Sequence, residues 1–192
     1  MELSNQFEEA LIYATQAHGN QTRKKTGIPF IAHILGVTAI ALEYGANETE
    51  AIGALLHDTV EDCGGAERLR DIREKFGDEV ARIVDGCTDT YEAPKPPWLE
   101  RKRAYVEHLK DSDSSIRLVS ASDKLHNTRA ILAELRRSGL EVFDRFAGKK
   151  EGTLWYYRTL VIAFRKHGDH SDLIDELDRV VTEIETFVRE RK

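Results

Sequence analysis

Apolar residues recur at intervals of three or four positions along most of the chain, separated by polar and charged residues. This spacing places the apolar side chains on one face of an α-helix, and no segment combines strand-like alternation with hairpin turns. The expected fold class is therefore all-α. The predicted helices cover approximately residues 5–18, 29–45, 48–63, 66–76, 79–87, 99–110, 114–137, 140–147, 151–167 and 173–188.

Glycine, proline and capping residues mark the boundaries between these helices. Asn47 and Asp78 are expected to cap the helices that follow them. Residues 19–27 form a polar loop between glycines, and this loop carries three consecutive cations, Arg23, Lys24 and Lys25. Residues 91–98 contain three prolines and must be irregular. A loop of that length in a compact domain is often a lid or the edge of a binding site.

Length and charge narrow the class of protein. A chain of 192 residues suits one domain, residues 1–192, and leaves little room for a second. The net charge of -6 argues against a nonspecific binder of nucleic acid or of an anionic membrane. The sequence has no apolar run of membrane length and no signal-like N-terminus, so we expect a cytoplasmic protein with free thiols at Cys63 and Cys87.

The predicted helix at residues 173–188 carries an apolar stripe along its whole length. Most stripes with this spacing pack into the core of their own chain. A minority form the seam of a coiled coil between two copies. The sequence therefore favours a core helix and leaves a homo-oligomer open.

The stretch from residue 54 to residue 62 changes from apolar to acidic within two helical turns. It contains His57, Asp58, Glu61 and Asp62 directly after two leucines. On one continuous helix, His57 would stack over Glu61, and Asp58 over Asp62. Charged groups beside such an apolar surface cost several kcal/mol unless they are paired or coordinated. The pattern therefore predicts a bound cation.

Residues of three predicted helices supply a mixed set of candidate metal ligands. The set contains two imidazoles and two carboxylates, from His33, His57, Asp58 and Asp123. Nitrogen and oxygen ligands of this kind suit Mn²⁺ or Fe²⁺ with positions left for water, and they argue against a closed structural zinc site rich in thiolates. Any one of these residues alone would more often be structural, so the prediction depends on the combination.

Four separated blocks of the sequence form a recognisable set, and they are Ala17–Lys24, Pro29–His33, Leu55–Asp62 and Ser122–Asn127. Together they resemble the signature of the HD-domain metallophosphohydrolases. They are most similar to the alarmone hydrolases, which include the hydrolase half of RelA/SpoT-type proteins and small stand-alone relatives. The resemblance implies an HD-domain helical bundle with a central metal site. It also implies one Mn²⁺ and the removal of the 3′-diphosphate from a hyperphosphorylated purine nucleotide.

The resemblance carries over to individual residues. It implies that His33, His57, Asp58 and Asp123 hold the metal. Glu61 and Asp62, which the metal does not use in this interpretation, would orient the attacking water or take its proton. Their alternative is a pair of solvated carboxylates at a helix end.

The resemblance also supplies three predicted substrate contacts, which are Arg23 and Lys24 beside the nucleotide and Lys102 on phosphate. Two more are predicted from the residues themselves: Asn127, beside the metal face, for sugar or base, and Tyr156 as an aromatic wall. Each has a structural alternative. For Arg23 and Lys24 it is a solvated loop and for Asn127 a helix-surface amide. For Lys102 it is an exposed helix charge and for Tyr156 a core aromatic. His18 is expected to be structural or to support the site from behind. His126 is expected at the surface or at a helix end.

Position 130 leaves the identity of the purine open. Guanine-specific relatives commonly carry Thr three residues after the asparagine, where this chain has Ala130. A hydroxyl that reads the base is therefore missing, so both (p)ppGpp and (p)ppApp are candidate substrates. Two further interpretations stay open. One is an HD phosphohydrolase for another nucleotide, such as a 5′-nucleotidase or triphosphohydrolase, and the other is a catalytically silent nucleotide-binding module.

Overall fold

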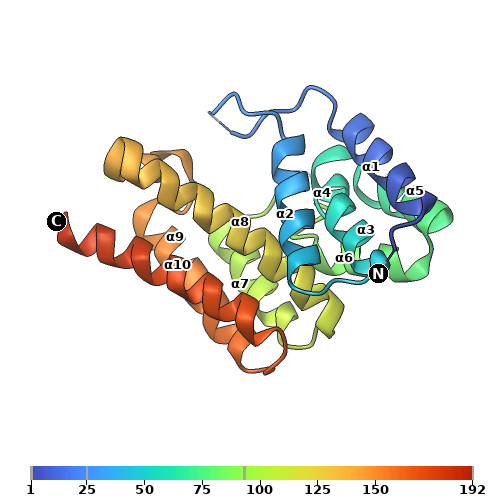
Figure 1. Ribbon diagram of the computed structural model, residues 1–192. Helices are drawn as coiled ribbons and strands as arrows, with labels where there is room; N and C mark the ends of the chain where they lie inside the picture. Colours follow the sequence, from blue (N-terminus) through green and yellow to red (C-terminus); the bar gives the residue numbers. More distant parts are fainter. Residues whose placement is uncertain (1, 25, 93, 192) are drawn as a thin grey trace.

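The computed structural model describes residues 2–24, 26–92 and 94–191. Its helices follow one another along the chain (Figure 1). They are α1 (Asn5–His18), α2 (Ile31–Glu43), α3 (Glu48–Leu56), α4 (Thr59–Cys63), α5 (Gly65–Phe76), α6 (Asp78–Cys87), α7 (Trp98–Leu109), α8 (Ser114–Ser138), the 3₁₀ helix η1 (Gly139–Arg145), α9 (Lys149–Arg165) and α10 (Ser171–Glu190).

The fold class is all-α, as the periodicity predicts. Within the described ranges the only extended pairing is an isolated bridge between Thr22 and Pro29, at the base of the polar loop. Cys63 and Cys87 are free thiols, as predicted. None of the helices in the described part of the chain has both the length and the apolar character that crossing a membrane requires.

Two apolar clusters form the interior. The larger one surrounds α8 and joins it to α2, α7, η1, α9 and α10, whereas the smaller one lies among α1, α2, α3, α5 and α6. Figure 1 shows α8 through the centre of the molecule with α10 along one side. The apolar stripe of α10 is buried in the larger cluster, which confirms its predicted role in the core. Helices α2, α3 and α8 pack against one another where the two clusters meet.

Capping side chains fix where several helices begin. Asn47 accepts a hydrogen bond from the backbone N–H of Glu50, and the Glu50 carboxylate accepts one from the N–H of Asn47. This reciprocal pair satisfies two N–H groups that a helix start leaves free. The predicted cap at Asp78 is wrong. The helix begins at Asp78 itself, after Gly77. The Asp78 carboxylate does not cap the helix but pairs with Arg73 at 3.2 Å.

The predicted helix at residues 48–63 is interrupted in its middle. Helix α3 ends at Leu56 and α4 begins at Thr59, so His57 and Asp58 form a turn. The Thr59 hydroxyl donates to the Leu56 carbonyl at 2.6 Å, and the His57 ring bonds the Ala54 carbonyl at 2.8 Å. These side chains hydrogen-bond backbone carbonyl groups at the end of α3, which lets the chain turn. The expectation of one continuous helix edge was therefore wrong.

A second difference concerns residues 140–147, where the sequence predicts an α-helix. The chain forms a 3₁₀ helix there, η1, and Val142 and Phe143 are buried in the larger cluster. A 3₁₀ helix is typical of short connecting segments. Packing of these two side chains against α8 and α9 therefore decides the conformation of this segment.

Candidate functional site

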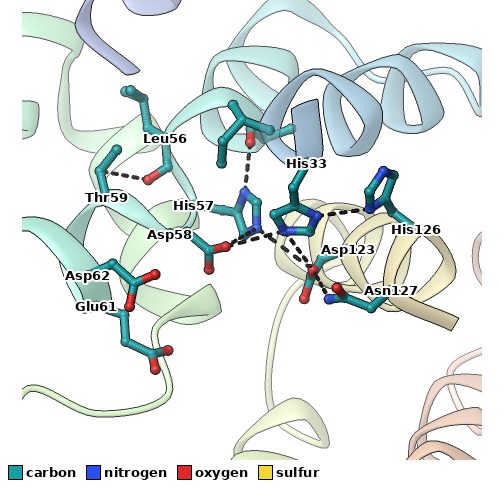
Figure 2. Close-up of polar contacts among 12 residues, drawn as sticks. His33, Leu56, His57, Asp58, Thr59, Glu61, Asp62, Asp123, His126 and Asn127 are labelled. Carbon is teal, nitrogen blue, oxygen red and sulfur yellow. Dashed lines mark hydrogen bonds and ion pairs between the residues drawn. The ribbon is translucent and has the colours of Figure 1, made fainter. Parts of the chain in front are cut away.

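Four side chains from different parts of the fold converge at the junction of α2, α3 and α8 (Figure 2). His33 Nε2 lies 3.3 Å from Asp58 Oδ2 and 3.3 Å from Asp123 Oδ1. His57 Nε2 lies 3.2 Å from the same Asp58 oxygen and 3.8 Å from the same Asp123 oxygen. The structure thus brings together all four residues that the sequence predicted as metal ligands.

The turn after α3 aims His57 into this cluster. A backbone carbonyl only accepts hydrogen bonds, so the bond from Nδ1 to the Ala54 oxygen requires the proton on Nδ1. The other ring nitrogen, Nε2, is buried, makes no hydrogen bond to any described residue and faces the two carboxylates. One ligand atom each of His33, His57 and Asp58 lies within 4.8 Å of the others. A buried nitrogen without a partner, beside carboxylate oxygens, fits a site for a divalent cation.

The opposite charges in the cluster shift one another's pKa values. Burial lowers the pKa of His57, but the nearby Asp58 and Asp123 carboxylates outweigh burial and raise it to about 9. Burial raises the pKa of Asp58, and the positive charges of His57 and His33 outweigh that effect and hold it well below its usual value. The pKa of Asp123 is likewise lowered, because Lys124 and the two histidines oppose the effect of burial. Both carboxylates are therefore ionised at neutral pH.

His126 belongs to this site, so its predicted place at the surface or a helix end was wrong. Its Nδ1 lies 2.9 Å from Nδ1 of His33, on the far side of the His33 ring from the carboxylates (Figure 2). Burial and the neighbouring His33 lower the pKa of His126 to about 4, so this ring is neutral near pH 7. His126 follows Asp123 by three positions on α8. That spacing places both on one helix face and was the available signal.

Glu61 and Asp62 lie on α4, beyond Asp58 on the side away from His126 (Figure 2). Lys95, which the sequence analysis did not select, places its Nζ 2.6 Å from Glu61 and 3.8 Å from Asp62. Lys95 lies on the proline-rich loop that was predicted as a lid or binding edge. Burial and the negative charges of Asp58 and Glu61 raise the pKa of Asp62.

A cavity of about 440 Å³ opens beside the cluster and is lined by all five predicted substrate contacts. Arg23 Nη2 donates to the Asn127 amide oxygen at 2.7 Å, and the Asn127 amide nitrogen donates to Asp123. These two hydrogen bonds link the polar loop to the cluster. Lys24 is exposed at the cavity and Ala130 also lines it. Lys25, expected to be solvated, lies outside the described residues.

Lys102 and Tyr156 form another part of the cavity wall. Lys102 Nζ lies 2.9 Å from the Asp89 carboxylate and 5.0 Å from the centre of the Tyr156 ring. Lys102 is therefore not an exposed helix charge. The Tyr156 side chain is packed in the core, yet its hydroxyl has no hydrogen-bond partner among the residues that the structure describes. A buried hydroxyl that lines a cavity without a partner can still bond a ligand.

His18 has the structural surroundings that the sequence predicts. Its ring is buried, stacks on Phe30 with 4.7 Å between ring centres, and bonds the Gln21 side chain at 2.8 Å. Gln21 in turn donates to Asp62 at 3.3 Å. His18 therefore supports the polar loop and the acidic end of the site from behind.

Residues 10–153 match the HD domain family. The chain is 41% identical over 128 residues to human (Homo sapiens) guanosine-3′,5′-bis(diphosphate) 3′-pyrophosphohydrolase MESH1, a match that covers 65% of this chain and 68% of that protein. The zebrafish (Danio rerio) MESH1 is 40% identical over 124 residues, which cover 63% of this chain and 66% of that protein. The matched segment thus spans about two thirds of the length of these relatives.

The fold also matches a solved structure of a metazoan orthologue of SpoT that hydrolyses ppGpp. The TM-score is 0.78 at 27% sequence identity, and the match covers 95% of this chain and 97% of that one. The sequence match, the helical architecture and the convergence of His and Asp side chains from three parts of the fold agree with one another. The chain belongs to the HD-domain family and, within it, is a relative of the MESH1 pyrophosphohydrolases.

Proposed function

We propose that this protein is a metal-dependent phosphoric diester hydrolase of the cytoplasm that removes the 3′-diphosphate from alarmone nucleotides, (p)ppGpp or (p)ppApp. The observation that carries the proposal is the convergence of two imidazoles and two carboxylates beside a cavity that cationic side chains line. The relationship to the MESH1 proteins supports the same reaction.

His33, His57, Asp58 and Asp123 would hold the metal, which we propose to be Mn²⁺, with Fe²⁺ or another divalent ion as alternatives. A divalent cation in such a site lowers the pKa of a bound water and neutralises phosphate charge. The protein residues supply the rest. His57 keeps its proton on Nδ1, where the Ala54 carbonyl accepts it, and so presents Nε2 to the site.

Glu61 and Asp62 act as the proton acceptor in this proposal. They lie one turn beyond Asp58, and the raised pKa of Asp62 brings that carboxylate closer to neutral pH, where a general base works well. Lys95 holds Glu61 at 2.6 Å and adds a positive charge at the mouth of the site. The attacking water gives a proton to a carboxylate as its oxygen bonds the phosphorus that carries the 3′-oxygen. The bond between that phosphorus and the 3′-oxygen breaks, diphosphate leaves with the water oxygen, and the 3′-oxygen takes up a proton from solvent to become the nucleotide hydroxyl.

The remaining contacts orient the nucleotide. The hydrogen bond from Arg23 to Asn127, at 2.7 Å, positions the Arg23 guanidinium. The guanidinium is then available to stack on a base or to bind phosphate. Lys24 contributes a second cation at the same edge. Lys102 and the unpartnered hydroxyl of Tyr156 supply further polar groups on the cavity wall, which suit a second phosphate group.

Metal binding should release a proton. In the metal-free protein the nearby carboxylates raise the pKa of His57 to about 9, so its ring is protonated below that pH, and a ligand nitrogen must be unprotonated. We therefore expect Mn²⁺ affinity to rise as pH increases toward about 9 and to level off above it. Titration calorimetry at pH 7.5 in buffers of different ionisation enthalpy measures the released protons. An enthalpy that does not depend on the buffer would contradict this assignment.

The substrate assignment is tested with ppGpp and ppApp side by side on Mn²⁺-loaded protein. We expect diphosphate release, with GDP or ADP as the other product. Chromatography of the nucleotides together with a diphosphate assay measures both products and ranks the two purines. Release of monophosphate or triphosphate instead would favour another HD phosphohydrolase activity. Bound metal with no turnover of either nucleotide would favour a different substrate or a silent binding module.

A further inference from the structure

Helix α2 presents two residues to α8 that are one turn apart, His33 and Gly36. The imidazole of His126, on α8, fills the space between them. Its Nδ1 lies 2.9 Å from His33 Nδ1, and the two ring centres are 4.8 Å apart. This ring therefore contacts the back of His33, opposite the edge that faces Asp58 and Asp123.

The hydrogen bond between the two rings has a defined direction if His33 binds metal. Its Nε2, which faces both carboxylates, must then keep a free lone pair, so the proton of the neutral ring is on Nδ1. That Nδ1–H can only donate, so His126 must accept through its own Nδ1. His126 thus holds the form of His33 that a metal site requires.

Gly36 is the reason that His126 reaches this position. A Cβ added at Gly36 would lie 2.3 Å from both Cδ2 and Nε2 of the His126 ring. Real Cβ atoms do not approach other atoms so closely, and the obstructing atoms belong to a ring that is held at its other edge by His33. A larger residue at Gly36 would therefore displace His126 from His33. Gly36 and His126 form one steric unit.

We propose that His126 is a positioning residue for the metal site, and that Gly36 is the space that admits it. His126 accepts the His33 Nδ1 proton and thereby fixes both the tautomer and the ring orientation of His33. This role rests on the metal site proposed above. Neither His126 nor Gly36 faces the carboxylates of the site directly, so both act through His33.

The test is a double-mutant cycle on Mn²⁺ affinity, measured by chelator competition on the purified, metal-stripped protein. His126→Ala should weaken Mn²⁺ binding by roughly 10- to 100-fold, the usual effect of losing a partner of a ligating histidine. Gly36→Ala alone should weaken it comparably, because the new methyl group displaces the His126 ring. In the His126→Ala background, Gly36→Ala should have no further effect, because the ring that it would strike is absent.

Two variants separate the hydrogen bond from packing. His126→Asn places an amide oxygen near the position of Nδ1 and should restore most of the affinity. His126→Leu fills the space without an acceptor and should not. Affinity within twofold of wild type in His126→Ala or His126→Leu would overturn the positioning role, as would additive effects in the cycle. If the wild-type protein bound no Mn²⁺, the assignment of the metal site itself would be refuted. If it hydrolysed another nucleotide, only the substrate assignment would change.

Discussion

Replacing Asp58 with Ala is expected to abolish both metal binding and hydrolysis, and Asp123→Ala is expected to do the same. Each carboxylate lies within 3.2 to 3.8 Å of both histidines of the cluster, so each substitution removes one of two negative charges from the site. What remains cannot balance a divalent cation. The lost transition-state stabilisation is several kcal/mol, on the order of 10³-fold or more in rate.

Metal content by plasma emission spectroscopy and diphosphate release together measure this effect. A matched control is Asp78→Ala on α6, where the side chain is 91% exposed and pairs with Arg73. That variant should keep its metal and its turnover. Full activity with stoichiometric metal in Asp58→Ala or Asp123→Ala would defeat the assignment of the site.

The double substitution Glu61→Gln, Asp62→Asn should leave the metal in place and slow turnover by a factor on the order of 10² or more. Neither side chain belongs to the cluster that binds the cation in our proposal, and both amides have nearly the shape of the carboxylates. The change therefore removes the proton acceptor without removing a ligand. Single-turnover rates with ppGpp or ppApp, at saturating Mn²⁺, measure the loss.

Glu61 and Asp62 should also determine how activity falls on the acidic side of the pH profile. A general base acts when deprotonated, and the pKa of Asp62 is raised by burial and by Asp58 and Glu61. Activity should therefore fall as pH decreases through this raised pKa, and the residual activity of the double variant should lack that fall. Glu74→Gln, on the exposed surface of α5, serves as the control. Unchanged turnover in the double variant would assign both carboxylates to the solvated surface.

The periodicity of the sequence determined much of the architecture. Spacing alone gave the long helices and the buried stripe of α10, because a helix that packs against a core must repeat its apolar residues every three or four positions. The motif blocks indicated the family, and their four candidate ligands do meet in space. Local pattern was sufficient for the helices and the stripe, because each is specified by residues near to one another in the chain, whereas the ligand set was predicted from the combination of separated blocks and the family resemblance. The single-domain organisation and the roles of individual residues stay predictions.

Only the tertiary structure decided how the segments contribute to the site. The turn at His57 and Asp58 depends on side chains that satisfy the carbonyl groups of Leu56 and Ala54, which a periodicity argument does not register. The contact of His126 with His33 joins residues 93 positions apart, and Lys95 reaches Glu61 across 34. Such contacts depend on how α2, α4, α8 and the proline-rich loop pack together. Helical spacing specifies which face of a helix is buried, but packing decides which side chains meet there.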